Sequence, residues 1–178
     1  MGIRLPAHSL LLALLLLAGC GEAPSLDRTV AKSELTGCKL LDSMADDRAS
    51  ADPRQLKLIS EAKESYRKGQ YGVAEAKFRK ATEDTAFGMA STSRVATLEA
   101  WYGLAASYDQ LRRFDLADPV YEHIRSSYGE SVTYFNNYGY SLRLRGDTAG
   151  ARREFEKAMR IAPTCQITRN NLAALEND

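Results

Sequence analysis

A pattern of large and very small side chains recurs three times along this chain, in runs of equal length. In its clearest copy, the run 132–165, the small residues Gly139 and Ala151 alternate with bulky residues at helical spacing. Gly146 marks a turn between the two halves, and Pro163 lies close to the end of the run. Such a run predicts two antiparallel helices joined by a short turn. Because one helix pair cannot bury its own apolar face, the pattern also predicts that further copies stack against it.

Two further copies of the pattern precede this one. The run 98–131 abuts it without a gap, and the run 55–88 comes before a nine-residue insertion, 89–97. In all three copies the eighth and twentieth positions are Ala or Gly, which predicts that the two helices of a pair approach closely there. The insertion is expected either to lengthen a helix or to loosen the connection between the first two pairs.

Signals at both ends define the extent of the helical domain. Asp52 followed by Pro53 is typical of a helix start, because a carboxylate caps the first turn and proline is tolerated at the first helical position. Residues 166–178 predict one further amphipathic helix, of the kind that covers the open end of a stacked array. The sequence therefore predicts an all-α solenoid of three helix pairs plus a C-terminal capping helix, occupying residues 52–178. An unrelated helical bundle is the alternative.

Residues 1–19 predict a lipoprotein signal peptide. A single positive charge, Arg4, precedes a leucine-rich run over 10–17 that is too short to cross a bilayer core of about 30 Å. The segment that ends Leu-Ala-Gly-Cys at Cys20 resembles the lipobox of bacterial lipoproteins, which implies cleavage before Cys20 and attachment of acyl chains such as palmitate. Glycine rather than aspartate follows Cys20, so we expect sorting to the outer membrane, facing the periplasm. An ordinary signal peptide with an incidental cysteine is the alternative.

Residues 20–51 are predicted to be a lipidated, flexible tether between the membrane and the folded domain. The stretch is polar and of mixed charge. A flexible chain of about 30 residues has an end-to-end distance of about 30 Å, so the domain would stand away from the membrane surface.

Charge and motif content argue against several classes of function. Arg4 is the only charged residue in the signal peptide, so the rest of the chain has 23 basic and 23 acidic side chains and offers no footprint for nucleic acid. The sequence shows no phosphate-binding loop, no metal-ligand spacing and no nucleophile in the context of a base. His123 stands among polar neighbours on a predicted helix. We therefore expect no enzymatic activity, no cofactor or metal, and no small-molecule substrate.

Two cysteines, Cys38 and Cys165, remain once Cys20 is assigned to lipid. In an oxidising compartment such as the periplasm, a remaining pair favours a disulfide. That bond would fold the tether back to the last helix pair. The alternative is that Cys165 is an unlinked small residue at the edge of a helix.

The first helices of the pairs are predicted to line a concave groove that binds a protein partner. An asparagine side chain has donors and an acceptor, so it can pair with the backbone of an extended peptide. Two adjacent asparagines on the first helix of the last pair recur one repeat period later in the capping helix. The predicted groove residues are Asn136, Asn137, Tyr140, Arg143, Asn170 and Asn171, with Lys63, Arg67, Tyr102, Asp109 and Gln110 as weaker candidates. Packing between neighbouring helices is the alternative role for the asparagines.

The 34-residue period with small residues at fixed positions resembles the tetratricopeptide repeat. With the lipobox, segments 136–141, 144–147 and 170–172 are most similar to the TadD family, repeat lipoproteins of tight-adherence (Flp) pilus assembly systems. That resemblance implies an adaptor that helps place or stabilise the outer-membrane secretin or another pilus assembly component. The alternative is a general cell-envelope adaptor for peptidoglycan or outer-membrane-protein machinery.

Overall fold

The part of the chain that the structure describes is helical throughout. The computed structural model describes residues 47–86 and 93–176, and these contain no β-strand. The elements in chain order are the 3-10 helix η1 (Arg48–Ser50) and the α-helices α2 (Pro53–Arg67), α3 (Tyr71–Ala86), α4 (Arg94–Gln110), α5 (Phe114–Tyr128), α6 (Val132–Leu144), α7 (Thr148–Ile161) and α8 (Gln166–Ala174). The predicted signal peptide, Cys20 and Cys38 lie outside the described residues.

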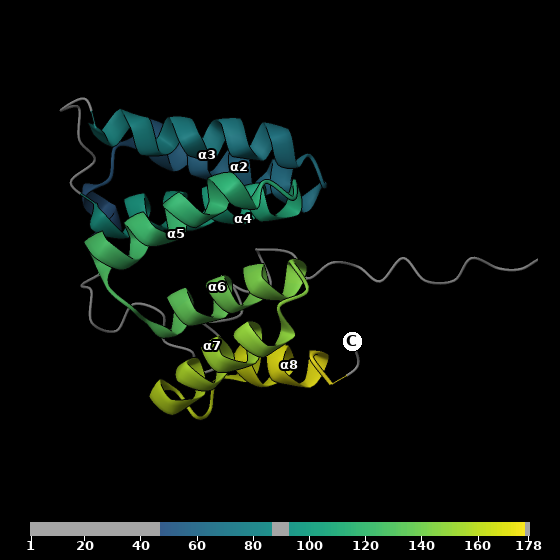
Figure 1. Ribbon diagram of the computed structural model, residues 1–178. Coiled ribbons are helices and arrows are strands. Elements are labelled where there is room, and N and C mark those ends of the chain that lie inside the picture. Colours follow the sequence, from purple (N-terminus) through teal and green to yellow (C-terminus); the bar gives the residue numbers. More distant parts are fainter. Residues whose placement is uncertain (1–46, 87–92, 177–178) are drawn as a thin grey trace, which may run out of the picture.

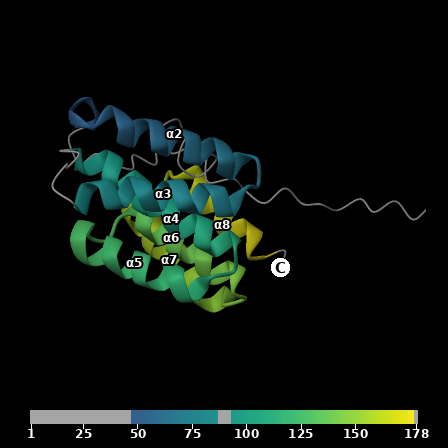
Figure 2. The ribbon, with the colours of Figure 1, turned by 90° about the horizontal axis from the view of Figure 1, so that it is seen from above.

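The helices form three antiparallel pairs, α2–α3, α4–α5 and α6–α7, followed by the single helix α8 (Figure 1). The first helices form one layer, in which α2 contacts α4, α4 contacts α6, and α6 contacts α8. Seen from above, the pairs overlap, as expected for a stack (Figure 2). The three predicted helix pairs and the predicted capping helix are therefore all present.

The starts and turns of the helices follow local sequence signals. The Asp52 side chain accepts a hydrogen bond of 2.8 Å from a backbone N–H in the first turn of α2, and Pro53 opens that helix, as predicted. The turns within the first and last pairs contain Gly69 (φ +73°) and Gly146 (φ +85°), in a conformation that glycine adopts without strain. The equivalent residue of the middle pair is Arg112 (φ +59°), so there a residue with a side chain is held in the left-handed region.

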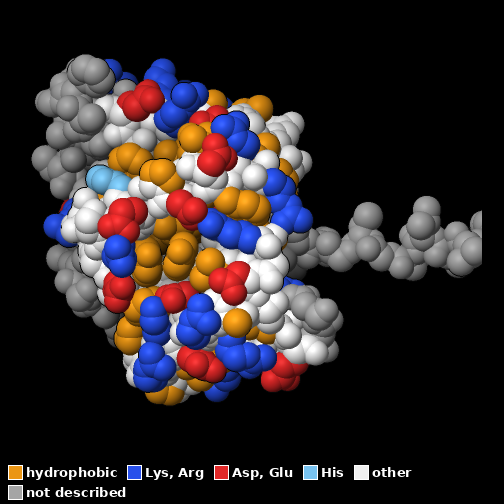
Figure 3. Space-filling view, in the orientation of Figure 1, with side chains coloured by type: hydrophobic (Ala, Val, Ile, Leu, Met, Phe, Trp, Pro, Cys, Tyr) orange, Lys and Arg blue, Asp and Glu red, His pale blue; other side chains and the backbone are white. Residues whose placement is uncertain are grey.

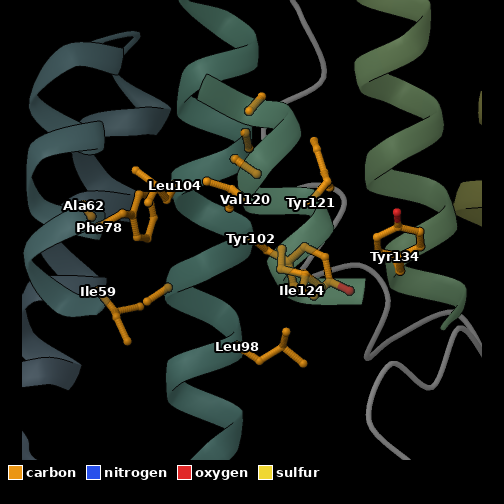
Figure 4. Packing of buried hydrophobic residues seen from close by; sticks show 14 of the residues in the cluster. Ile59, Ala62, Phe78, Leu98, Tyr102, Leu104, Val120, Tyr121, Ile124 and Tyr134 are labelled. Carbon is orange, nitrogen blue, oxygen red and sulfur yellow. The ribbon is translucent and has the colours of Figure 1, made fainter. Parts of the chain in front are cut away.

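Small residues allow the close approach of neighbouring helices. A Cβ atom on Gly139 would lie 2.6 Å from Cε1 of Phe155, which confirms the close approach predicted at the eighth position of the last pair. Between the first two pairs, a Cβ atom on Gly103 would lie 2.3 Å from Cε1 of Phe78. Figure 4 shows the ring of Phe78 pointing from α3 toward α4, where it lies beside Leu104.

The described part of the nine-residue insertion lengthens a helix, which is one of the two expected outcomes. Residues 94–97 form the first turn of α4. Ser93 caps this turn, because its Oγ accepts a hydrogen bond of 3.0 Å from the Ala96 N–H.

The folded body extends further toward the N-terminus than predicted. The sequence predicts residues 47–51 as the end of the tether, but they include η1 and pack on the domain, with Ala51 in the core. The carboxylate of Asp47 accepts hydrogen bonds from Ser93 Oγ at 2.7 Å and from the Arg94 N–H at 2.6 Å. Residues 47–51 thus belong to the folded body because Asp47 contacts the start of α4, which is distant in the chain. The local composition of the segment does not reveal this contact.

Candidate partner-binding face

The first helices of the three pairs and α8 form a continuous surface, here called the first-helix face. Charged side chains connect neighbouring helices across it. Lys63 Nζ on α2 lies 3.0 Å from Oε1 of Glu99 on α4, and Nη2 of Arg48 lies 2.9 Å from the other oxygen of Glu99. Glu99 therefore holds η1, α2 and α4 together, and the weaker groove candidate Lys63 is engaged in this ion pair.

Polar side chains of three first helices lie close together. The side chain of Gln110 on α4 is near the hydroxyls of Tyr66 on α2 and Tyr140 on α6, and it opposes the rise in the pKa of both. Burial raises the pKa of both tyrosines, so both hydroxyls stay protonated at physiological pH. Tyr140 is half-buried beside Gln110, so part of its side chain stays accessible on the first-helix face.

Three of the predicted groove asparagines are bonded within the protein. Asn136 is 6% exposed, and Asn137 and Asn171 are each 9% exposed. Asn136 Nδ2 donates to Thr168 Oγ1 on α8 at 2.9 Å, and Asn136 Oδ1 accepts from Asn171 Nδ2 at 3.2 Å. Asn137 Nδ2 donates to the carbonyl of Thr133, one turn earlier, at 2.9 Å. The bonds of Asn136 and Asn171 join α6 to the capping helix. This is the alternative role, packing between neighbouring helices, that the sequence left open for the asparagines. Contact of the asparagines with a partner stays a prediction.

The other three predicted groove residues reach the surface. Asn170 is exposed on α8, where its Oδ1 accepts from Gln166 Nε2 at 2.8 Å. Tyr140 and Arg143 are half-buried on α6, about one helical turn apart. Their amide, hydroxyl and guanidinium groups can donate to a ligand, and the first two can also accept. These three residues form the accessible part of the predicted groove.

Two of the weaker candidates, Tyr102 and Asp109, do not line a groove. Their side chains are buried, with exposed fractions of 4% and 1%. Asp109 Oδ1 accepts from Ser141 Oγ at 2.6 Å, and Asp109 Oδ2 accepts from Tyr121 Oη at 2.8 Å. Burial raises the pKa of Asp109 to about 6, although both hydroxyl donors and the Arg145 guanidinium oppose the rise. Asp109 is thus an inward-facing carboxyl group between α4, α5 and α6, and sequence reasoning placed it on the wrong side of its helix.

Cys165 precedes α8, is fully buried and is disulfide-bonded. An unlinked Cys165, the alternative drawn from the sequence, is therefore not observed. The chain has two other cysteines, Cys20 and Cys38, and both lie outside the described residues. The predicted pairing with Cys38 stays a prediction.

His123 is exposed on α5 and packs on Trp101, with ring centroids 4.3 Å apart. Within residues 47–86 and 93–176, no group of three or more His, Cys, Asp or Glu side chains could hold a metal ion. Among these same residues, no helix has the length and apolar character needed to span a membrane.

Comparison with protein families identifies the repeat type. The tetratricopeptide repeat family model matches residues 98–124, which include most of α4 and the larger part of α5. A search of curated proteins found no match to the chain. With the three helix pairs and the capping helix, the family match confirms the predicted fold class, an all-α tetratricopeptide-repeat solenoid. Such repeats typically bind protein partners, and proteins built from them are generally scaffolds rather than enzymes.

Proposed function

We propose that this protein is a lipid-anchored scaffold of the bacterial outer membrane, facing the periplasm, which binds an extended segment of a protein partner across its first-helix face. The lipobox resemblance at residues 17–20 supports the anchor. One observation carries the binding role: Tyr140 and Arg143 on α6 and Asn170 on α8 reach the surface, while Asn136 and Asn171 on the same two helices are held by internal bonds.

The chemistry of these three residues favours an extended peptide as the ligand. The guanidinium of Arg143 donates in a planar fork and has no acceptor, so it pairs with carboxylate or carbonyl oxygens. The Asn170 amide and the Tyr140 hydroxyl both donate and accept, so they can pair with exposed backbone groups. A peptide segment without secondary structure of its own supplies such unpaired groups along its whole length.

We propose assembly of a Flp (tight-adherence) pilus or its secretin as the process that this scaffold serves. The support is the resemblance of segments 136–141, 144–147 and 170–172 to the TadD family. The second candidate is a general envelope adaptor for peptidoglycan or outer-membrane-protein machinery. Deletion of the gene separates the two, because the first proposal requires loss of the pilus and the second predicts an intact pilus with an envelope defect.

The binding surface is tested with a double variant, Arg143→Ala with Asn170→Ala. The full-length protein is expected to co-purify with the secretin or another pilus component from detergent-solubilised membranes. The double variant should raise the Kd of the purified pair by at least about tenfold, because a hydrogen bond to a charged group contributes about 1.5–3 kcal/mol. Arg153→Ala, exposed on α7, is the matched control. Equal affinity of the double variant and the wild type would show that the surface is misassigned.

The anchor is tested at Cys20. Metabolic labelling with a palmitate analogue should mark the wild-type protein and leave Cys20→Ser unlabelled. The variant should also move from the membrane fraction to the soluble periplasmic fraction. Recovery of unlabelled wild-type protein in the soluble fraction would contradict the lipid anchor without affecting the test of the binding face.

We also propose Cys38 as the disulfide partner of Cys165. Acyl attachment to Cys20 would take its sulfur out of disulfide chemistry, and the chain has three cysteines in all. Peptide mapping of the non-reduced protein should therefore recover a Cys38–Cys165 cross-link. A Cys20–Cys165 cross-link would contradict both the pairing and the lipidation.

A further inference from the structure

The hydroxyl group of Tyr121 stands between two acceptors that belong to different helices. Its oxygen lies 2.8 Å from Oδ2 of Asp109 on α4 and 3.1 Å from the carbonyl oxygen of Asn137 on α6. Tyr121 itself belongs to α5 and is 2% exposed. Figure 4 shows its side chain between α5 and the first turns of α6. Three helices therefore meet at one buried hydroxyl.

A hydroxyl has a single proton, so it cannot donate fully to both acceptors at once. When Asp109 is ionised, the stronger, charged acceptor takes the tyrosine proton, and the bond to Asn137 is lost. When Asp109 carries a proton on Oδ2, the carboxyl group donates to Tyr121 Oη, and the tyrosine proton is free for the Asn137 carbonyl. Ser141 Oγ donates to Asp109 Oδ1 in both states. In the protonated network, each of the three contacts (Ser141 to Asp109, Asp109 to Tyr121, and Tyr121 to Asn137) thus has its own donor hydrogen.

The surroundings of Asp109 favour this protonated network. The titratable and charged side chains that face Asp109 are Tyr66 of α2, Asp118 and Tyr121 of α5, and Tyr140 and Arg145 from the α6 side. Arg145 is engaged elsewhere: its two terminal nitrogens bond the two oxygens of Asp118 at 3.0 and 2.6 Å, and Nη2 also donates to Ser141 Oγ at 2.9 Å. The Arg145 guanidinium is therefore shared with another carboxylate. Burial, which raises the pKa of Asp109, outweighs the opposing effect of this cation.

We propose that Asp109, Tyr121 and Asn137 form a proton-operated clamp between the middle and last helix pairs. Uptake of a proton from solvent forms an O–H bond at Asp109 Oδ2, turns the Tyr121 proton toward Asn137 and adds a hydrogen bond between α5 and α6. Loss of the proton returns the Tyr121 hydrogen bond to Asp109 and removes the bond to Asn137, so that the Ser141–Asp109 bond remains between these groups of the two pairs. The clamp does not depend on what the first-helix face binds.

The direction of the pH response follows from burial. The pKa of Asp109 in the folded protein, about 6, lies above its ordinary value of 3.8. Stabilisation by a group whose pKa is raised is complete below the unfolded pKa and is lost as the pH rises through the folded pKa. Asp109 alone should therefore raise the folding equilibrium constant roughly tenfold when the pH is lowered from 8 to 5.

The direct test is a pH titration of the isotope-labelled full-length protein in detergent micelles, followed by NMR. The side-chain carboxyl carbon of Asp109 and the backbone carbonyl carbon of Asn137 should titrate together, with a common midpoint near 6. An Asp109 midpoint near its ordinary value, or an Asn137 carbonyl that does not respond to pH, would overturn the proposal. This experiment needs no substitution, so it decides the matter even if the variants below fail to fold.

Asp109→Asn supplies the second test, because its amide can donate to Tyr121 and accept from Ser141, as the protonated carboxyl does. In this variant the Asn137 carbonyl should keep its acid-form chemical shift at every pH, and the tenfold gain in folding equilibrium constant should disappear. Glu156→Gln, which removes an exposed carboxylate on α7, is the matched control and should leave both responses unchanged. An Asn137 carbonyl that still titrates in Asp109→Asn would assign the response to another group and refute the clamp.

Discussion

The two junctions between successive helix pairs are built differently. α3 packs along α4, with the ring of Phe78 against Gly103, whereas α5 and α6 are more widely spaced and touch at few points (Figure 1). The second junction is filled by the rings of Tyr121, Tyr134 and Tyr138, whose centroids lie 5.2 to 6.3 Å apart. One repeat architecture thus contains a tight apolar junction and a wider, aromatic one that depends on polar bonds.

Three positions account for the difference. The places that Ala100, Gly103 and Leu104 occupy in α4 are taken in α6, one repeat period later, by Tyr134, Asn137 and Tyr138. Each change adds volume and a polar group, so α6 cannot approach α5 as closely as α4 approaches α3. Hydrophobic side chains accordingly gather on the surface between α5 and α6 (Figure 3). The junction widths are therefore set by a few side chains rather than by the repeat itself.

The largest loss of stability is expected for Gly103→Asn, which gives α4 the asparagine that α6 has at the equivalent position, 137. The new Cβ atom would lie 2.3 Å from the fully buried ring of Phe78, so the tight junction must open, at a cost of about 3 kcal/mol in the free energy of unfolding. Urea denaturation followed by circular dichroism measures this cost. Gly72→Asn on α3 is the matched control, because a Cβ atom there meets nothing within 4 Å. Similar costs at the two glycines would mean that the first junction is not tight.

The next effect concerns the polar bonds of the wide junction. Tyr121→Phe should lower the free energy of unfolding by about 1.5–3 kcal/mol at neutral pH, because it removes a hydroxyl that donates to the buried carboxylate of Asp109. Tyr128→Phe, on the same helix and half-buried, is the control and should cost less. If both variants unfold at the same urea concentration, the Tyr121 hydroxyl contributes only packing.

The reciprocal exchange, Asn137→Gly, should have a smaller effect than Gly103→Asn. Glycine inside a helix costs about 1 kcal/mol, and the bond from Asn137 Nδ2 to the Thr133 carbonyl is also lost, but no clash is created. The same urea measurement should give a loss of about 1–2 kcal/mol. Asn137→Ala separates the two contributions, because alanine retains helix propensity. A loss equal to that of Gly103→Asn would contradict the contrast between the junctions.

The smallest effect is expected at Arg112, which spans the wide junction by donating a hydrogen bond to the Leu144 carbonyl. Arg112→Gly loses this bond but relieves a left-handed backbone, so the net change should stay within about 0.5 kcal/mol. Arg112→Ala loses the bond and keeps the strained conformation. The glycine variant should therefore have the higher Tm of the two. The reverse order would show that the backbone at this turn is unstrained.

The sequence predicts the fold well because its pattern of large and small residues reflects contacts between residues that are close in the chain. Gly139 must be small because Phe155 lies against it, and both residues belong to the same run, 132–165. The start of α2 is equally local, since Asp52 caps the helix that Pro53 opens. The contact between Asp47 and the start of α4 joins residues that are far apart in the sequence, and composition carries no trace of it.

The candidate site is predicted less well, because the direction of a polar side chain depends on the neighbouring helix. Asn170 and Asn171 are adjacent, yet the first is exposed and the second bonds Asn136. In the sequence, Asp109 looks like a solvated aspartate near the end of a helix. In the structure it is buried, and so is Tyr66, the residue at the equivalent position of the first pair. The large aromatic residue at the equivalent position of the first pair was the available signal for the inward direction of Asp109.

The attachment of Asp47 has a mechanical consequence. If the segment before residue 47 leads to a lipid anchor, tension from the membrane enters the folded body where Asp47 bonds Ser93 and Arg94, at the start of α4. The middle of the array would then bear the force before α2, although η1 and α2 come before α4 in the chain. A scaffold held at its centre can be pulled without separating its outer repeats from one another.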